Sequence, residues 1–364
     1  MVFRNLQSIR GLACIIIVLT HIAGSEADRF AHAWLSPLRL FGYCGLNLFF
    51  VLSGFIITWV YYEKLGNRRS AVGFVQKRFV RIYPVYWACL LIAVVAKLLM
   101  EGVILYHPSY AGRTKEVIRV ICLLPHRNIN LYLPQAWSLV YEVFCYLAFC
   151  GFFFLPRRAF VPLIVAWFCA TLAGGLMLGT SSPYLLTFIT QPMVLDFLSG
   201  CGIAVLARRG HCRGGWLWTA VGLSGYAIGA ILNGLHVTDG MGNYWHRFYL
   251  AGIPSAFLVF GLTALERTSG RTLPRWLESV GDASYSIYLT HLTVVSAARL
   301  EVFRAGGTGG AHLLWLVGFF AASMMVGFAA FFAVERPVLS WLRRRSSRAV
   351  PKVISPPAPI RRAA

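Results

Sequence analysis

The sequence predicts an all-α, polytopic integral membrane protein with about ten transmembrane helices. Hydrophobic residues make up 58% of the 364 residues, and charged residues only 13%, about half of the share found in soluble domains. The mean hydropathy is +0.65. Most of the protein surface must therefore face lipid rather than water.

Ten apolar stretches approach the length that crosses a hydrocarbon core about 30 Å thick. They lie at 11–24, 38–62, 84–100, 137–155, 160–179, 189–206, 215–235, 248–265, 283–300 and 312–334. We expect residues 1–342 to form one membrane domain. The remainder, 343–364, is rich in Arg, Pro and Ser without apolar periodicity, which predicts a disordered, basic cytosolic tail.

The formal net charge of +21 agrees with this topology. If the N-terminus is cytosolic, most Lys and Arg residues fall on the cytosolic side, and the positive-inside rule then places both termini in the cytosol. The basic charge therefore indicates topology and attraction to anionic lipid, not a nucleic-acid site. Cys201, His211 and Cys212 lack a fourth ligand at suitable spacing, so no metal site is predicted.

Ionisable residues inside apolar helices are functional candidates, and the first two are Arg10 and His21. Their spacing of eleven residues is close to three full helical turns, so both side chains project from one face, about 16 Å apart along the axis. With Arg10 at the cytosolic boundary, His21 is expected near the middle of the membrane. The alternative is a structural His that is hydrogen-bonded to a neighbouring helix.

The segment FVQKRFVRIYP ends at Pro84, which is expected in the first turn of the third helix. Arg78 and Arg81 are i, i+3 neighbours there, so both guanidinium groups are expected to grip one phosphate-bearing ligand. The alternative is an ordinary positive-inside anchor. In the fourth helix, Ser138, Tyr141 and Glu142 share one face, and a carboxylate at Glu142 needs a partner or a proton.

The segment GDASYSIYLTH places Gly281, Ser284, Tyr288 and His291 as a polar stripe on an apolar helix. Helix–helix hydrogen bonding competes with a functional role here, and we prefer it for Ser284. Asp196 in the sixth helix is a further buried acid. Glu335 is expected to be an ion-pair partner at the cytosolic exit.

Taken together, these segments resemble the acyltransferase-3 family of membrane O-acyltransferases, in particular its exopolysaccharide and nodulation-factor acetyltransferases. The motifs that carry the resemblance follow in the order of the family, from LQSIRGLACIIIVLTHIAG and CGLNLFFVLSGFII through FVQKRFVRIYP, WSLVYE and ASYSIYLTH to VERP. The resemblance implies ten membrane helices and an acyl-CoA donor, expected to be acetyl-CoA, and we expect no tightly bound cofactor.

The resemblance also implies that His21 is essential for transfer, that Arg10 is the Arg eleven positions before it, and that Arg78 and Arg81 form the family's Arg pair. Similar proteins acetylate sugars of cell-surface glycans, usually built on a lipid carrier in the bacterial inner membrane. Two positions depart from the family pattern. Asn47 stands where an acid is common, and Thr290 replaces a frequent aromatic residue.

The combined hypothesis is an O-acetyltransferase in which His21 deprotonates a sugar hydroxyl and Glu142 or Asp196 orients the imidazole. Direct attack and an acyl-His intermediate both remain open. The expected partners are acyl-CoA, a surface polysaccharide or lipid-linked oligosaccharide, and the bilayer. Substrate binding is assigned to six residues: Arg10, Arg78, Arg81, Ser138, Tyr288 and His291. The alternative functions are a glycolipid transporter or flippase and a non-catalytic membrane partner of a polysaccharide synthase.

Overall fold

The computed structural model describes residues 3–28, 33–42, 44–101, 114–125, 133–178, 182–235, 244–297 and 310–341, which contain helices and no strand. Nine segments of this part are long and apolar enough to cross a membrane. The predicted all-α, polytopic membrane fold is therefore confirmed. The main helices in chain order are α1 (Arg4–Ala27), α2 (Cys44–Tyr61), α3 (Arg68–Glu101), α4 (Thr114–Cys122), α5 (Trp137–Cys150), α6 (Phe160–Met177), α7 (Tyr184–Ile189), α8 (Pro192–Arg208), α9 (Gly215–Gly234), α10 (Tyr244–Arg247), α11 (Ile253–Ser269), α12 (Arg275–Ala297) and α13 (Gly310–Ala330).

The expected span at 283–300 corresponds to α12 (Arg275–Ala297). It has 23 residues, but it is not among the nine segments with an apolar composition. Every residue from Ala283 to His291 is buried. A helix that is covered by other helices need not be apolar all round, because its polar groups find partners inside the protein.

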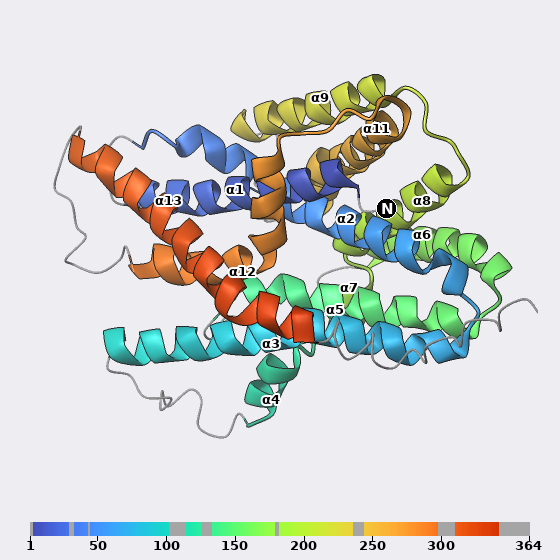
Figure 1. Cartoon of the computed structure of the whole chain (residues 1–364), viewed down its shortest axis with the longest axis horizontal. Helices are drawn as coiled ribbons and strands as arrows, with labels where there is room; N and C mark the ends of the chain where they lie inside the picture. Colours follow the sequence, from blue (N-terminus) through green and yellow to red (C-terminus); the bar gives the residue numbers. More distant parts are fainter. Residues whose placement is uncertain are drawn as a thin grey trace, which may run out of the picture.

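Three helix pairs organise the bundle: α1 packs along α12, α2 along α8, and α9 along α11 (Figure 1). The first pair is close because Gly11 lies against the backbone of Leu277, and Gly281 lies against the backbone of Gln7. Small residues of this kind allow the close approach of membrane helices. The pairing brings the Arg10–His21 face of α1 against the polar stripe of α12.

The prediction that Pro84 begins the third helix was wrong. Pro84 lies inside α3, which starts at Arg68 and carries Arg78 and Arg81 in its interior. In a bilayer the backbone cannot leave the helix for water, so a Pro is tolerated where neighbouring helices satisfy the freed carbonyl groups.

The predicted tail, 343–364, lies outside the described residues. The cytosolic location of both termini stays a prediction, which a topology reporter fused after Ala364 would test.

We expect Gly200→Ala to destabilise the protein by about 1–3 kcal/mol, the usual cost of overpacking. A methyl group at Gly200 would overlap the carbonyl oxygen of Val51 and force α8 away from α2. Gly202 lies two residues further along α8 with nothing near its added methyl group, so Gly202→Ala is the matched control. Thermal unfolding in detergent measures both variants, and equal melting temperatures would contradict the packing argument.

Candidate active site

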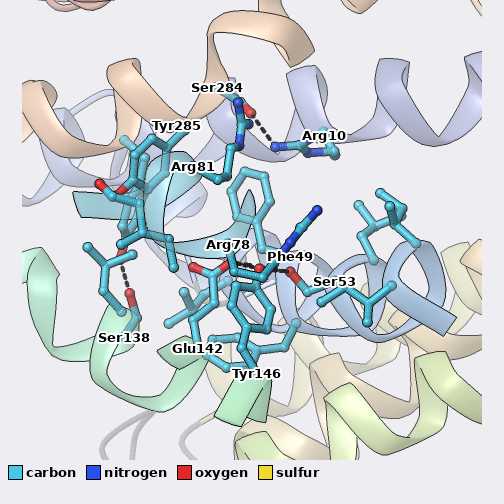
Figure 2. Close-up of a pocket in the computed structure, with 18 residues that line it drawn as sticks. Arg10, Phe49, Ser53, Arg78, Arg81, Ser138, Glu142, Tyr146, Ser284 and Tyr285 are labelled. Atoms are coloured by element: carbon cyan, nitrogen blue, oxygen red, sulfur yellow. Dashed lines mark hydrogen bonds between the residues drawn. The ribbon is translucent and has the colours of Figure 1, made fainter. Parts of the chain in front are cut away.

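A partly open cavity of about 120 Å³ lies between α1, α2, α3, α5 and α12 (Figure 2). Six of the eight predicted site residues line it. Two do not, His21 and His291. The polar and ionisable lining residues are Arg10, Ser53, Arg78, Arg81, Ser138, Glu142, Tyr146, Ser284, Tyr285 and Tyr288.

Two of the three cavity arginines have partners in the protein. Arg81 forms an ion pair with Glu335, whose side chain is 1% exposed and also accepts a hydrogen bond from Ser286 at 2.6 Å. Arg10 donates to Ser284 Oγ at 3.3 Å and to Gln7 Oε1 at 3.3 Å. The guanidinium of Arg81 is therefore not free to bind a ligand with its whole fork, which corrects the expectation of two equivalent arginines.

Arg78 differs from both. Its Nε is buried without a hydrogen-bond partner, and within the described part of the chain no carboxylate forms an ion pair with it. Its guanidinium lies 5.6 Å from the ring centroid of Tyr146 and 6.0 Å from that of Phe74. The side chain is half-buried, and rings of this kind stabilise a cation by only about 0.5–2 kcal/mol. Arg78 is therefore the cation of the cavity with unused capacity for an anionic ligand.

Glu142 does not orient His21. Its Oε1 accepts hydrogen bonds from the hydroxyls of Tyr146 and Ser53, the latter at 3.4 Å. Figure 2 shows these three side chains together on one wall of the cavity, beside Arg78. Tyr141 shares the sequence motif but lies elsewhere, stacked on Phe188 with ring centroids 4.4 Å apart.

Asp196, the other proposed orienting acid, accepts a hydrogen bond from Asn47 Nδ2 at 2.6 Å. Its side chain is completely buried. Asn47, which stands where the family commonly has an acid, is thus the residue whose amide donates to Asp196. Neither the Asp196 nor the Glu142 contacts in the described residues include His21, so the predicted carboxylate partner of the imidazole was wrong.

A hydroxyl pair forms the end of the cavity next to the histidines. Ser138 Oγ lies 2.8 Å from the hydroxyl of Tyr288, and both hydroxyls lie 3.1 Å from the carbonyl oxygen of Gln135. The ring of Tyr288 lies 5.8 Å from that of His291. Tyr288 therefore lines the cavity and also lies next to His291.

His21 and His291 meet across the α1–α12 contact. His291 Nε2 lies 3.3 Å from His21 Nδ1, and the ring centroids are 5.0 Å apart. His291 is completely buried, whereas His21 is partly exposed. The two residues that sequence spacing placed on one face of α1 thus both meet the polar stripe of α12, Arg10 at Ser284 and His21 at His291.

Sequence reasoning missed four polar residues of this region, Ser53, Tyr146, Tyr285 and Gln135. Tyr146 stands four residues after Glu142, so its place on the same helix face was available from spacing. Ser53 and Tyr285 lie inside quoted motifs, but no local pattern sets them apart. Only the packing of α2 and α12 brings them to the cavity.

The cavity with its fixed cations, and the nearby pair of His21 and His291, suit the transfer of a group from an anionic donor. The family model for the acyltransferase domain matches residues 3–334. The chain therefore belongs to the acyltransferase-3 family and is a multi-pass membrane acyltransferase.

Two relatives match along most of their length. The exopolysaccharide production protein ExoZ of Rhizobium meliloti (strain 1021) is 30% identical over 84% of this chain and 92% of that protein. The acyltransferase MdmB of Streptomyces mycarofaciens is 25% identical over 94% of this chain and 92% of that protein. No solved structure matches.

Proposed function

We propose that the protein moves an acyl group, expected to be acetyl, from acyl-CoA to a hydroxyl of a surface polysaccharide or of its lipid-linked precursor. We place it in the bacterial inner membrane. The similarity to a protein named for exopolysaccharide production supports this acceptor class. The family membership favours an enzyme over the transporter and over the non-catalytic partner of a synthase.

The observation that supports acyl-CoA most directly is Arg78, which shares the cavity with Arg10 and Arg81 and whose buried Nε has no hydrogen-bond partner among the described residues. Acyl-CoA carries several phosphate charges, and guanidinium groups bind phosphate oxygens with paired N–H donors. The cavity volume suits one phosphate-bearing part of the donor, not the whole molecule. The flexible pantetheine arm is then free to run past Tyr288 towards the histidines.

In the proposed reaction His21 Nε2 removes the proton of the acceptor hydroxyl as its oxygen attacks the thioester carbonyl. The new C–O ester bond forms and the C–S bond breaks. The proton then passes from His21 to the sulfur of the departing thiolate, which leaves as CoA. Atoms and charge balance without a metal or a redox partner.

Mass spectrometry of surface polysaccharide from a deletion strain tests this proposal. We expect the mass increments of the acyl group to disappear on deletion and to return with the wild-type gene, but not with His21→Ala. An equally acylated polymer in the deletion strain would contradict the proposed acceptor. A loss of polymer with unchanged acylation of the remainder would indicate transport instead.

A further inference from the structure

We propose that His291 is a positioning residue that accepts a hydrogen bond from His21 Nδ1–H and so directs His21 Nε2 towards the reacting hydroxyl. The inference rests on the proposed function, because it assigns the partner of the base in that reaction. It also replaces the predicted substrate-binding role of His291.

The first step of the argument is the tautomer of each ring. His21 Nδ1 lies 2.8 Å from the carbonyl oxygen of Ile17. His291 Nδ1 lies 2.7 Å from the carbonyl oxygen of Tyr288 and 3.2 Å from that of Ile287. A carbonyl oxygen only accepts, so both Nδ1 atoms carry the proton, as this hydrogen-bond network assigns it. In a neutral imidazole the other nitrogen then has a free lone pair.

The second step is the contact between the rings. The lone pair of His291 Nε2 faces His21 Nδ1–H at 3.3 Å. This N–H is therefore shared between the carbonyl of Ile17 and the ring of His291. Because the proton of neutral His21 is on Nδ1, its Nε2 has the lone pair and is the nitrogen that can take a proton.

The third step is the rigidity of the acceptor. His291 is 0% exposed, and two carbonyls of its own helix hold its Nδ1. The two rings lie on helices that pack closely against each other, with Gly11 and Gly281 at the backbone contact. When His21 becomes an imidazolium, its Nδ1–H meets two acceptors that are already in place. Preorganised dipoles of this kind stabilise a developing charge without reorganisation.

A neutral acceptor also suits the surroundings. In many enzymes a carboxylate holds the base, but an ionised carboxylate inside a bilayer is costly. The two carboxylates that the sequence analysis proposed as partners, Glu142 and Asp196, have other partners. His291 supplies a hydrogen-bond acceptor in their place with no formal charge.

Two substitutions at position 291 separate the positioning role from a structural one. His291→Phe keeps a buried ring and removes the acceptor. His291→Gln places an amide near the position of Nε2 and keeps an acceptor. We expect His291→Phe to lower kcat about tenfold, at the lower end of the range for hydrogen bonds to charged groups, because the contact is long and shared. We expect His291→Gln to recover most of this loss, with the KM for both substrates unchanged in each variant.

A raised KM for the acceptor with an unchanged kcat would overturn the inference in favour of substrate binding. Equal losses of kcat in the Phe and Gln variants would overturn it in favour of a structural role. Thermal unfolding of both variants shows whether each protein remains folded. The tautomer of His21 is then measured by NMR in each variant that is folded.

A second measurement does not depend on turnover. Solid-state NMR of ¹⁵N-histidine protein, with His21→Ala used to assign the signals, reports which ring nitrogen carries the proton. We expect His21 with a protonated Nδ1 and an unprotonated Nε2, and a changed Nδ1 shift in His291→Phe. A proton on Nε2 of neutral His21 would overturn the inference. Failure of the wild-type protein to consume acyl-CoA would instead contradict the proposed function and leave the NMR result standing.

Discussion

Replacing His21 by Ala is expected to lower the rate of acyl transfer by about 10²–10⁴, the range that a positioned general base contributes. Among the described residues, the polar contacts of the imidazole go to Ile17 and His291 and include no carboxylate. The variant leaves one buried acceptor on His291 unpaired, which costs about 1–3 kcal/mol. We therefore expect normal insertion and a small loss of thermal stability.

The rate of CoA release by the purified variant measures this prediction. The matched control is His211→Ala, because His211 is exposed and lies outside the cavity. Near-normal turnover in His21→Ala would remove His21 from the mechanism. Rapid quenching of the wild-type protein with acyl-CoA alone, followed by mass spectrometry, separates an acyl-His21 intermediate from direct attack.

Replacing Arg78 by Met is expected to raise the KM for acyl-CoA about ten- to a hundredfold. The loss of one charged hydrogen-bonding contact costs about 1.5–3 kcal/mol, and each 1.4 kcal/mol is tenfold in affinity. The same substitution removes a half-buried cation with which no carboxylate of the described residues forms an ion pair. The melting temperature of the Arg78→Met protein should therefore be unchanged or higher, because residues that serve binding often lower the stability of the folded protein.

Arg81→Met is the matched comparison, one helical turn away. It leaves Glu335 buried without its ion-pair partner, which typically costs about 3–5 kcal/mol. We therefore expect Arg81→Met to destabilise the protein where Arg78→Met does not. A Lys at position 78 keeps the charge without the guanidinium fork and should restore binding only in part. If Arg78→Met lowers the melting temperature and leaves the KM for acyl-CoA unchanged, Arg78 is a structural anchor.

The sequence predicts the helices well, and it also predicts which polar residues share one face of α1 and one face of α12. Hydropathy identifies the membrane segments, and the spacing of eleven residues places Arg10 and His21 on one side of α1, where the structure finds both against α12. The polar stripe of α12 is visible for the same reason, because helical periodicity is a local property.

The pairing of the polar groups was not accessible in this way. Arg81 and Glu335 are separated by 254 residues, and His21 and His291 by 270. Only helix packing decides which of several buried acids and bases meet. The prediction for Pro84 was wrong for a different reason. It used the preference of Pro for the first turn of a helix, whereas a helix in lipid continues through a Pro because the backbone must keep its hydrogen bonds.

The most direct measurement of the central claim uses the wild-type protein, purified in detergent or lipid discs, with acetyl-CoA that carries a labelled acetyl group. Surface polysaccharide or its lipid-linked precursor from the deletion strain serves as the acceptor. We expect time-dependent transfer of the label into an alkali-labile ester on the glycan, with one free CoA thiol released for each acetyl group transferred. Intact acetyl-CoA in the presence of this acceptor, with the folded protein shown by thermal unfolding, would contradict the account.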